Sequence, residues 1–426
     1  MQSPHASPSP LESPEGNYLS AQLAPLQQLM LADTLAKGIT SGTHVEQVEI
    51  HFIPEISQNR IEAAWGATVM ATEALRVAFS GSSGIPDGYQ LAKGPTDLTI
   101  EREIPTCWEA WREAARQHNF LDNRSAPWIA SYWPDARCFI WTFHHALLDG
   151  RSIARILRNF LQNLHGQPLA PLALTTWRGP TRQSIDAAET YFQTIRPQLA
   201  RPLFPLALEI PTKPADPRRA CHHLGAEFAH SFATTLATQA ELSAPTVLIW
   251  TWGQTICQLA GVESVVVEQV RCGASPHGEA GAGFTMTTFP VLIRRADDGN
   301  LLKSLRDFRR DLLELRAIET VSEQDLAPNH FPDLSAAACS VIMVERGTLR
   351  HLIGESTCCG VIESIHLHEP TSEWPTASGY IFPMMQLEVE GPGRHDLLEK
   401  WITCLQETLT LIRDAAPETN AATPPF

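Results

Sequence analysis

Two adjacent histidines, His144 and His145, stand shortly before Asp149 and Gly150 in the sequence. A neutral imidazole near pH 7 is a competent general base toward an attacking amine or hydroxyl. Asp149 need not touch the reacting groups, because a carboxylate in a tight loop more often anchors that loop through an arginine or through backbone N–H groups. Gly150 would let the chain bend where a Cβ would clash. The four residues therefore predict a general-base site whose imidazole is held by the loop that carries it.

The pattern lies between a predicted hairpin and a predicted helix. Residues 128–133 and 138–143 are aromatic-rich, β-prone runs joined by residues that suit a turn. A helix is predicted after Gly150, because apolar residues recur there at helical spacing. Ser152 is the expected N-cap of this helix and Gly166 its expected stop.

Only one of the two histidines can face a reaction site, because neighbouring side chains on a strand point to opposite faces. The other must be packed and hydrogen-bonded. A metal site formed by His144, His145 and Asp149 is disfavoured, since the adjacent histidines diverge and no third histidine stands at a ligand-like offset such as HxxxH. The pair His222-His223 has no downstream Asp-Gly and is assigned to a surface or packing role.

Strands and helices intermix in both halves of the chain, which predicts an α/β (α+β) fold of two similar-sized lobes. We expect a disordered tail over residues 1–18, an N-terminal lobe over 19–182, a C-terminal lobe over 183–415 and a second disordered tail over 416–426. The other expected strands cover residues 48–52, 265–270, 284–293, 337–344 and 381–389. The other expected helices cover residues 23–35, 61–74, 185–195, 228–242, 247–259, 300–315 and 398–412.

The composition excludes several classes of protein. The chain has 426 residues, with 32 basic and 47 acidic side chains and a formal net charge of −15. A strongly basic nucleic-acid binder is excluded, because phosphate repels an acidic chain at long range. No apolar run approaches the ~20 residues of a membrane-spanning helix. The nine cysteines are scattered without a CxxC pair, so neither a disulfide framework nor a zinc knuckle is expected. Since no signal-peptide pattern is present, we expect the reduced cytoplasm as the location.

The pattern from His144 to Gly150 resembles the HHxxxDG signature of the chloramphenicol-acetyltransferase-like acyltransferases, and in particular of the condensation domains of nonribosomal peptide synthesis. The resemblance covers roughly residues 23–412. Further segments are similar to family motifs and keep the family's order and spacing. These segments are Leu23–Met30, Glu73–Phe79, Gly283–Pro290, Gln324-Asp325 with Pro328, and Asp333–Ser335.

The sequence departs from the family pattern at a few positions. Ser275 stands where the family often has an arginine that pairs with the motif aspartate, and Arg271 is a candidate substitute. Thr287 replaces an asparagine, and Thr72 replaces a histidine. No adenylation or carrier segment follows Phe426, which favours a free-standing enzyme.

The resemblance implies two acetyltransferase-like lobes in a V-shaped pseudo-dimer, with a central tunnel and His145 near its middle. An acyl thioester would enter one mouth, on the phosphopantetheine arm of a carrier protein or on coenzyme A, and an amine or hydroxyl acceptor would enter the other. His145 would remove the acceptor's proton, or orient the acceptor and stabilise the oxyanion, with His144 and Asp149 in support. Thr287 and Thr288 would either donate hydrogen bonds into the tunnel or pack within their strand. No metal and no covalently bound cofactor is implied.

The expected function is an acyltransferase that forms an amide or an ester in nonribosomal peptide or other secondary-metabolite biosynthesis. Two alternatives stay open, namely a coenzyme A-dependent O-acyltransferase and a catalytically idle scaffold that binds carrier proteins. Arg151, Arg155 and Arg158 beside the motif suit either an acidic carrier or a coenzyme A phosphate. The expected partners are a carrier protein and a small nucleophilic acceptor, with no nucleic acid and no membrane span.

Overall fold

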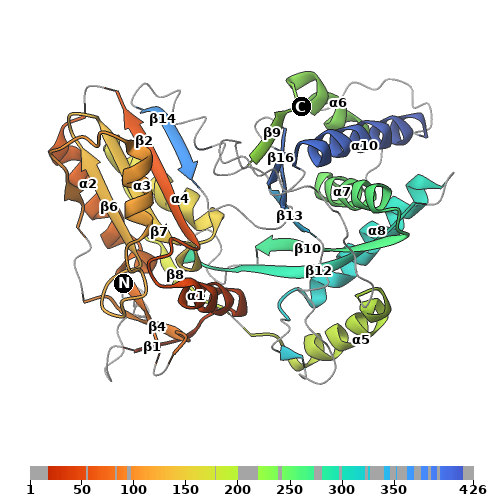
Figure 1. Cartoon of the computed structure of the whole chain (residues 1–426), viewed down its shortest axis with the longest axis horizontal. Coiled ribbons are helices and arrows are strands. Elements are labelled where there is room, and N and C mark those ends of the chain that lie inside the picture. The colour runs from red at the N-terminus through yellow and green to blue at the C-terminus, as the bar shows by residue number, and fades with distance from the viewer. Residues whose placement is uncertain are drawn as a thin grey trace, which may run out of the picture. The chain divides into compact units, whose positions relative to one another are not determined.

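The computed structural model describes residues 18–53, 56–81, 84–93, 97–177, 179–199, 219–237, 242–272, 281–296, 300–321, 325–326, 340–345, 352, 362–368, 376–381, 385–390 and 394–415. The chain forms two compact units (Figure 1). The first unit contains Met1–Gly179, Cys272–Met286 and Thr348–Pro370. The second contains Pro180–Arg271, Thr287–Gly347 and Thr371–Phe426.

The first unit is built on a five-stranded sheet with the order β14-β2-β7-β6-β5. Its strands are β2 (Val45–Phe52), β5 (Thr99–Ile100), β6 (Trp128–Trp133), β7 (Cys138–His144) and β14 (Ile362–His368). β7 pairs antiparallel with both β6 and β2, and β14 adds to the outer side of β2 in antiparallel register. The predicted hairpin is therefore confirmed as β6 and β7, and the predicted strand over residues 48–52 is confirmed within β2.

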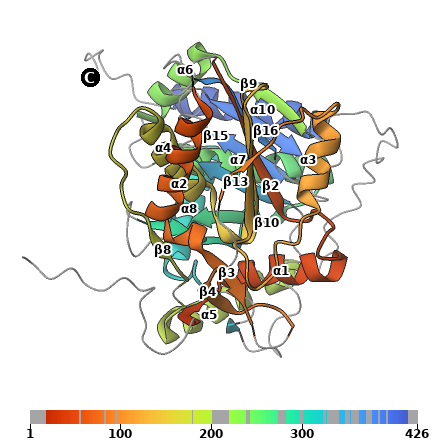
Figure 2. The same ribbon diagram turned by 90° about the vertical axis from the view of Figure 1, so that its left-hand side faces the viewer.

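Both faces of this sheet are covered by helices. The helices are α2 (Gln58–Ala71), α3 (Trp108–Arg116) and α4 (Gly150–Leu164), with α2 and α4 packed against each other (Figure 2). On one face, Trp65 of α2 contacts Trp141 of β7 and Phe160 of α4. On the other face, Trp111 of α3 packs edge-on against Trp133. Because strand side chains alternate, odd-numbered residues of β7 point to α2 and α4, and even-numbered ones point to the opposite face.

Smaller elements complete the first unit. They are β1 (Tyr18–Gln22), α1 (Pro25–Lys37), the 3-10 turn η1 (Glu73–Arg76), β3 (Val77–Ser80), β4 (Gly88–Leu91), the 3-10 turn η2 (His145–Leu147), β8 (Ala173–Thr175) and β11 (Gly281–Gly283). Strands β1, β4 and β3 form an antiparallel sheet, and β8 pairs in parallel with β11. Since Tyr18 opens β1, the predicted tail over residues 1–18 is wrong at its last residue. The remaining predicted tail residues, 1–17 and 416–426, lie outside the described part of the chain.

The second unit has a mixed six-stranded sheet with the order β12-β10-β13-β15-β16-β9. Its strands are β9 (Arg219–His223), β10 (Ser264–Cys272), β12 (Met286–Arg294), β13 (Val341–Glu345), β15 (Thr376–Tyr380) and β16 (Gln386–Glu390). Its helices are α5 (Arg182–Leu199), α6 (Ala226–Ala237), α7 (Ala244–Ala260), α8 (Leu301–Glu314), the 3-10 turn η4 (Leu315–Ala317) and α10 (Arg394–Asp414).

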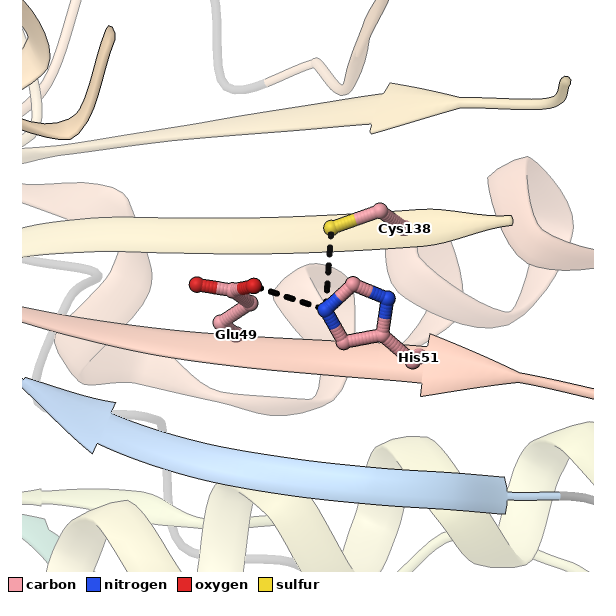
Figure 3. A group of neighbouring side chains, drawn as sticks. All are labelled: Glu49, His51 and Cys138. Atoms are coloured by element: carbon pink, nitrogen blue, oxygen red, sulfur yellow. Dashed lines mark hydrogen bonds and ion pairs between the residues drawn. The ribbon is translucent and has the colours of Figure 1, made fainter. Parts of the chain in front are cut away.

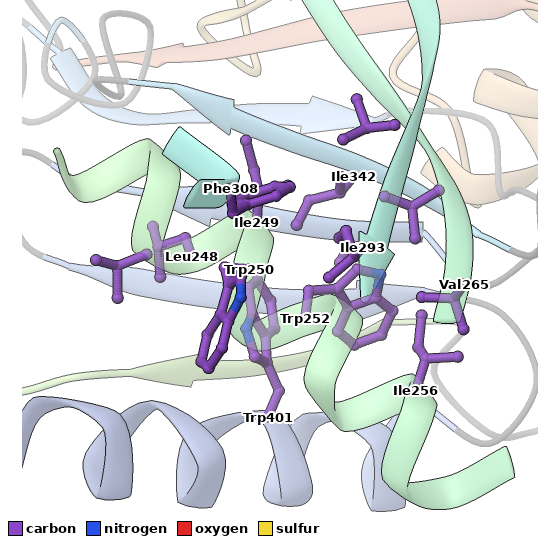
Figure 4. Packing of buried hydrophobic residues seen from close by; sticks show 14 of the residues in the cluster. Leu248, Ile249, Trp250, Trp252, Ile256, Val265, Ile293, Phe308, Ile342 and Trp401 are labelled. Carbon is purple, nitrogen blue, oxygen red and sulfur yellow. The ribbon is translucent and has the colours of Figure 1, made fainter. Parts of the chain in front are cut away.

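Helix α7 is the centre of the second core (Figure 4). Trp252 of α7 packs on Trp401 of α10 with ring centroids 5.1 Å apart, and its indole N–H donates to the Ser340 hydroxyl. Gly253 permits the close approach of α7 to β12, since a Cβ there would lie 2.4 Å from the Ile293 side chain. The indole N–H of Trp401 likewise donates to the Thr251 hydroxyl. Both buried tryptophans therefore have hydrogen-bonded N–H groups within the apolar core.

The division of the chain differs from the predicted one in a specific way. The first break, between Gly179 and Pro180, lies three residues from the predicted one, but residues 183–415 do not all belong to the second unit. Segment Cys272–Met286 returns to the first unit because β11 pairs with β8, and Thr348–Pro370 returns because β14 pairs with β2. Pairing of backbone N–H and C=O groups across these edges fixes both segments in the first unit.

One predicted strand is shorter than expected. The strand expected over residues 381–389 is β16, which begins at Gln386, and residues 382–384 lie outside the described part. β15, which precedes the predicted range, is not among the predicted strands, and it pairs antiparallel with β16 with Thr376 opposite Glu390. The strand expected over residues 337–344 begins at Val341 in the structure, and residues 337–339 lie outside the described part.

Helices and strands intermix in both units, as the predicted α/β (α+β) class requires. The V-shaped arrangement and the tunnel between lobes stay predictions. Among the helices described, none combines the length and the apolar character needed to cross a membrane.

Candidate active site

The motif residues lie in the first unit at a strand-to-helix junction, as predicted. β7 ends at His144, η2 begins at His145, and α4 begins at Gly150. A Cβ built on Gly150 meets nothing within 4 Å, and its φ is not in the left-handed region. The expected reason for a glycine at this position, a clash of the Cβ, is therefore wrong.

Asp149, and not the predicted Ser152, is the N-cap of α4. The Asp149 Oδ1 atom accepts the backbone N–H of Ser152 at 2.9 Å, which satisfies one of the free donors at the helix start. The Asp149 backbone has the extended conformation of a cap residue. Gly166, the predicted stop, follows the end of α4 at Leu164 with a φ of 72°, so that prediction is confirmed.

The second oxygen of Asp149 holds a distant segment of the chain. Oδ2 accepts both the backbone N–H of Thr285 at 3.0 Å and its hydroxyl at 2.8 Å. The Asp149 N–H in turn donates to the Gly283 carbonyl at 3.0 Å. The sequence allows either an arginine or backbone N–H groups as the anchor of Asp149. In the first unit its carboxylate binds backbone N–H groups, together with a threonine hydroxyl.

Arg271, the candidate substitute for the family arginine, has partners within its own unit. Its guanidinium donates to Glu319 at 3.0 Å and to Gln269 at 3.0 and 2.9 Å, all within the second unit. It also lies over the Phe289 ring, 5.6 Å from the centroid. Both oxygens of Asp149 accept hydrogen bonds from neutral donors of the first unit, and the suggestion that Arg271 substitutes for the family arginine stays a prediction.

Ser152 joins α4 to β11 through its hydroxyl. Ser152 Oγ donates to the Gly283 carbonyl at 2.8 Å, and the Gly283 N–H donates back to Oγ at 2.9 Å. Gly283 is required here, because a Cβ would lie 2.2 Å from the Thr175 carbonyl oxygen on β8. Asp149, Ser152, Gly283 and Thr285 thus form one hydrogen-bond network that holds the start of α4.

His144 is the packed histidine of the pair. Its Nδ1 accepts the N–H of Ala146 at 3.1 Å, so the ring proton is on Nε2. Nε2 lies 3.0 Å from the Thr34 hydroxyl, which accepts because its own hydrogen is donated to the Met30 carbonyl. Burial, together with smaller effects of the neighbouring His44 and His145, lowers the pKa of His144 to about 3. His144 is therefore neutral at any working pH and acts as a support.

His145 is the histidine that reaches solvent. Its side chain is 17% exposed, whereas His144 is fully buried. The backbone N–H of His145 donates to the His44 carbonyl at 2.7 Å. Phe284 lies edge-on to the imidazole, with ring centroids 5.9 Å apart. The Glu46 carboxylate lies 3.2 Å from Nδ1. Only the second imidazole of the pair is thus both held in place and accessible, as a general base must be.

The remaining predicted site residues have internal partners or lie apart. The Thr287 hydroxyl donates to the Glu319 carbonyl at 3.3 Å, and Thr288 is half-buried in β12. Arg155 donates to the Gly281 carbonyl at 2.6 Å, so it is part of the scaffold and not of a free basic patch. Arg151 and Arg158 are exposed. The predicted Ser275 position and residues 324, 328 and 333–335 of the family motifs lie outside the described residues.

Two residues of this site, Glu46 and Thr285, escape the sequence analysis. Thr285 lies inside the recognised segment Gly283–Pro290, but its partner stands 136 residues away, and no local pattern reports that distance. Glu46 has a signal, because it is in phase with Val48 and Ile50 on the apolar side of a predicted strand. An acid on an apolar strand face indicates a specific partner.

A second cluster of ionisable groups lies on the opposite face of the same sheet (Figure 3). Glu49, His51 and Cys138 each offer a donor atom within 4.8 Å of the others, and this donor set is of the type that binds zinc. However, Glu49 already accepts hydrogen bonds from His51 at 2.6 Å and from Arg112 and His368 at 2.9 Å each. Burial also raises the pKa of the Cys138 thiol, which opposes a thiolate ligand. We therefore assign this cluster a structural role.

Replacing Glu49 by Gln is expected to lower the free energy of unfolding by about 2 kcal/mol at pH 7. Burial by itself would raise the pKa of Glu49, but hydrogen bonds from His368 and His51 and the charge of Arg112 lower it to about 2. A carboxyl whose pKa is lowered in the folded protein stabilises the fold when the pH is above the ordinary pKa of 4.5. That stabilisation is lost as the pH falls from about 4.5 to about 2. Urea denaturation at pH 7 and pH 3 measures the effect, and more than half of the difference from wild type should be gone at pH 3. Glu109→Gln, at an exposed position, is the control, and an equal loss at both pH values would contradict the prediction.

The cavity described in the second unit has no connection with the predicted site residues. It has a volume of about 480 Å³ and is lined by residues of α7, α8 and α10, including Trp250, Gln254 and Cys404. None of its lining residues belongs to the motif or to the residues that hold it, so the chemistry is assigned to the first unit and not to this cavity.

Comparison with known sequences finds relatives but no matching family model. The chain is 25% identical over 357 residues to one of the proteins that make up the linear gramicidin synthase of Brevibacillus parabrevis, which covers 76% of this chain and 7% of that protein. It is 24% identical over 294 residues to AM-toxin synthetase AMT1 of Alternaria alternata, which covers 66% of this chain and 6% of that protein. The chain thus corresponds to a small part of the length of these curated relatives.

Comparison with solved structures defines the fold. The condensation domain from the monacolin K polyketide synthase MokA superposes with a TM-score of 0.67 at 12% identity, covering 94% of this chain and 99% of that one. A variant of the starter condensation domain of rhizomide synthetase RzmA, in complex with C8-CoA, gives a TM-score of 0.67 at 14% identity, covering 93% and 96%. The chain therefore has the fold of the condensation domains of nonribosomal peptide and polyketide synthetases, and the resemblance predicted from its sequence is confirmed.

Proposed function

We propose that this chain is a condensation-type acyltransferase that joins a thioester-bound acyl donor to an amine or hydroxyl acceptor. The observation that carries the proposal is the contrast within the histidine pair. His144 is buried, neutral and bonded through both ring nitrogens, whereas His145 is partly exposed at the start of the 3-10 turn η2. The condensation-domain fold supports the same reaction class.

The reaction needs one proton-handling group and an activated acyl donor. The acceptor nitrogen or oxygen attacks the thioester carbonyl carbon, a C–N or C–O bond forms, and the C–S bond breaks. The acceptor's proton passes to His145 and then to the leaving sulfur, which leaves as a thiol. Because the donor is already a thioester, no covalent intermediate on the protein is required. A second contribution of the same imidazole, as the protonated ring, is stabilisation of the tetrahedral oxyanion.

The donor is proposed to arrive on a phosphopantetheine arm, either of a carrier protein or of coenzyme A. The RzmA starter domain is described with C8-CoA, and the gramicidin relative is part of a peptide synthase. Arg151 and Arg158 are the exposed basic residues near the motif that suit either a carrier's acidic surface or a phosphate. The reaction is proposed to take place in the cytoplasm.

The test is a donor exchange with one acceptor panel. The purified chain is incubated with acyl-loaded carrier protein or with the same acyl group on coenzyme A, together with amine and hydroxyl acceptors, and products are detected by mass spectrometry. An acyl–acceptor product above the buffer rate supports the proposal, and the preferred donor assigns the carrier or the coenzyme A form. Binding of the carrier without any product, whichever donor is used, would favour the catalytically idle scaffold.

A further inference from the structure

Glu46 is an acid on the apolar side of a buried strand. It shares a face of β2 with Val48, Ile50 and Phe52, which belong to the apolar core of the first unit. The Glu46 side chain is only 6% exposed. Burial of an ionised carboxylate costs free energy unless polar partners compensate it, so such a residue persists only with a specific partner.

The strand register brings Glu46 to His145. Glu46 lies opposite Phe143 in the antiparallel pair of β2 and β7, and His145 follows two positions beyond Phe143. The backbone N–H of His145 donates to the backbone carbonyl of His44 at 2.7 Å, so the main chain stays beside β2 after β7 ends. A diagonal neighbour across antiparallel strands is within reach of a long side chain. Glu46 Oε1 accordingly lies 3.2 Å from His145 Nδ1.

The contact distinguishes the two nitrogens of the imidazole. A carboxylate beside Nδ1 favours the tautomer that carries its proton there, which leaves the lone pair on Nε2. Phe284, edge-on to the ring, limits its rotation from another side. Both Glu46 and His145 belong to the first unit, so their contact is formed inside one compact body.

We propose that Glu46 is a positioning residue that holds His145 with its proton on Nδ1 and its lone pair on Nε2, the atom that would take the acceptor's proton. This inference rests on the proposed acyltransferase function. When Nε2 takes that proton, the imidazole becomes a cation, and the Glu46 carboxylate stabilises it until the proton passes to the leaving sulfur. Glu46 neither gives nor takes a proton in this step. The single proton that leaves the acceptor is the one that His145 passes to the leaving thiolate, which departs as a thiol.

Replacement of Glu46 by Gln tests this role in the acyl-transfer reaction. We expect kcat to fall by roughly 10- to 100-fold while KM changes by less than about two-fold, because the lost interaction strengthens only as charge develops on His145. Glu46→Asp keeps the carboxylate on a shorter side chain and should recover part of kcat. The matched control is Glu49→Gln, the same substitution on the opposite face of the same strand, which should keep kcat at temperatures where it is folded. Equal kcat in Glu46→Gln and wild type would overturn the inference.

A second measurement does not depend on activity. In the ¹⁵N-histidine NMR spectrum of the whole chain, the ring signals of His145 are identified by their loss in His145→Ala. The wild type should show the tautomer with the proton on Nδ1, and Glu46→Gln should shift the population toward Nε2. A wild-type His145 protonated on Nε2 would overturn the inference even if Glu46→Gln does not fold. If the tautomer is as expected but His145→Ala leaves turnover unchanged, the proposed function fails and the pairing of Glu46 with His145 stands.

Discussion

His145→Ala is expected to lower turnover in the acyl-transfer reaction by roughly 10²–10⁴-fold, the range that a positioned general base contributes. The reason is the division of roles within the motif. His144 has a pKa of about 3, with both nitrogens in hydrogen bonds to Thr34 and Ala146, so it has no capacity to replace its neighbour. Turnover is measured with the donor that the exchange experiment selects.

The variant should leave the fold and the binding of the donor nearly unchanged. His145 belongs to a short 3-10 turn and is not one of the residues of the first unit's apolar core, so truncation leaves that core intact. His395→Ala, at an exposed position in the second unit, serves as the control. If His145→Ala is folded and turns over at the wild-type rate, the first unit is not a general-base site, and a carrier-binding scaffold becomes the better account.

The local structure around the motif could be predicted from the sequence because its signals are local. Aromatic, β-prone runs around a turn define the hairpin of β6 and β7, and helical periodicity defines α4. The predicted N-cap is wrong because Asp149 and Ser152 are both good cap residues. They exchange roles here, since the Ser152 hydroxyl is used to bind Gly283.

The non-local parts could not be predicted in the same way. β11 has only three residues, Gly281–Gly283, and its glycines carry no strand signal. Its position follows from backbone pairing with β8 and from the contact with Thr175 that excludes a Cβ. Arg271 is a candidate only through its nearness to Ser275 in the sequence, whereas its guanidinium is bonded to Glu319 in the second unit. Pairings between distant segments need coordinates.

Asp149→Asn is expected to destabilise the first unit by about 3 kcal/mol and to lower turnover by roughly 10-fold or more. The carboxylate uses one oxygen for the Ser152 N–H and the other for the N–H and hydroxyl of Thr285. An Asn side chain has one acceptor and one NH₂ group. If its oxygen caps α4, its NH₂ faces the N–H of Thr285, and if the amide flips, the cap is lost. In either case a buried donor has no acceptor, and the loop that carries His145 loses its anchor.

Thr285→Val separates this explanation from one based on the charge of Asp149. The valine variant removes only the hydroxyl, keeps the backbone N–H bond and the helix cap, and should cost about 1 kcal/mol. Because both changes affect one shared hydrogen bond, the double variant Asp149→Asn/Thr285→Val should be more stable than the sum of the single losses predicts, by about 1 kcal/mol. Urea denaturation of the four proteins measures this coupling. Strictly additive losses would mean that Asp149 holds the loop through a partner other than Thr285, as an arginine pairing would require.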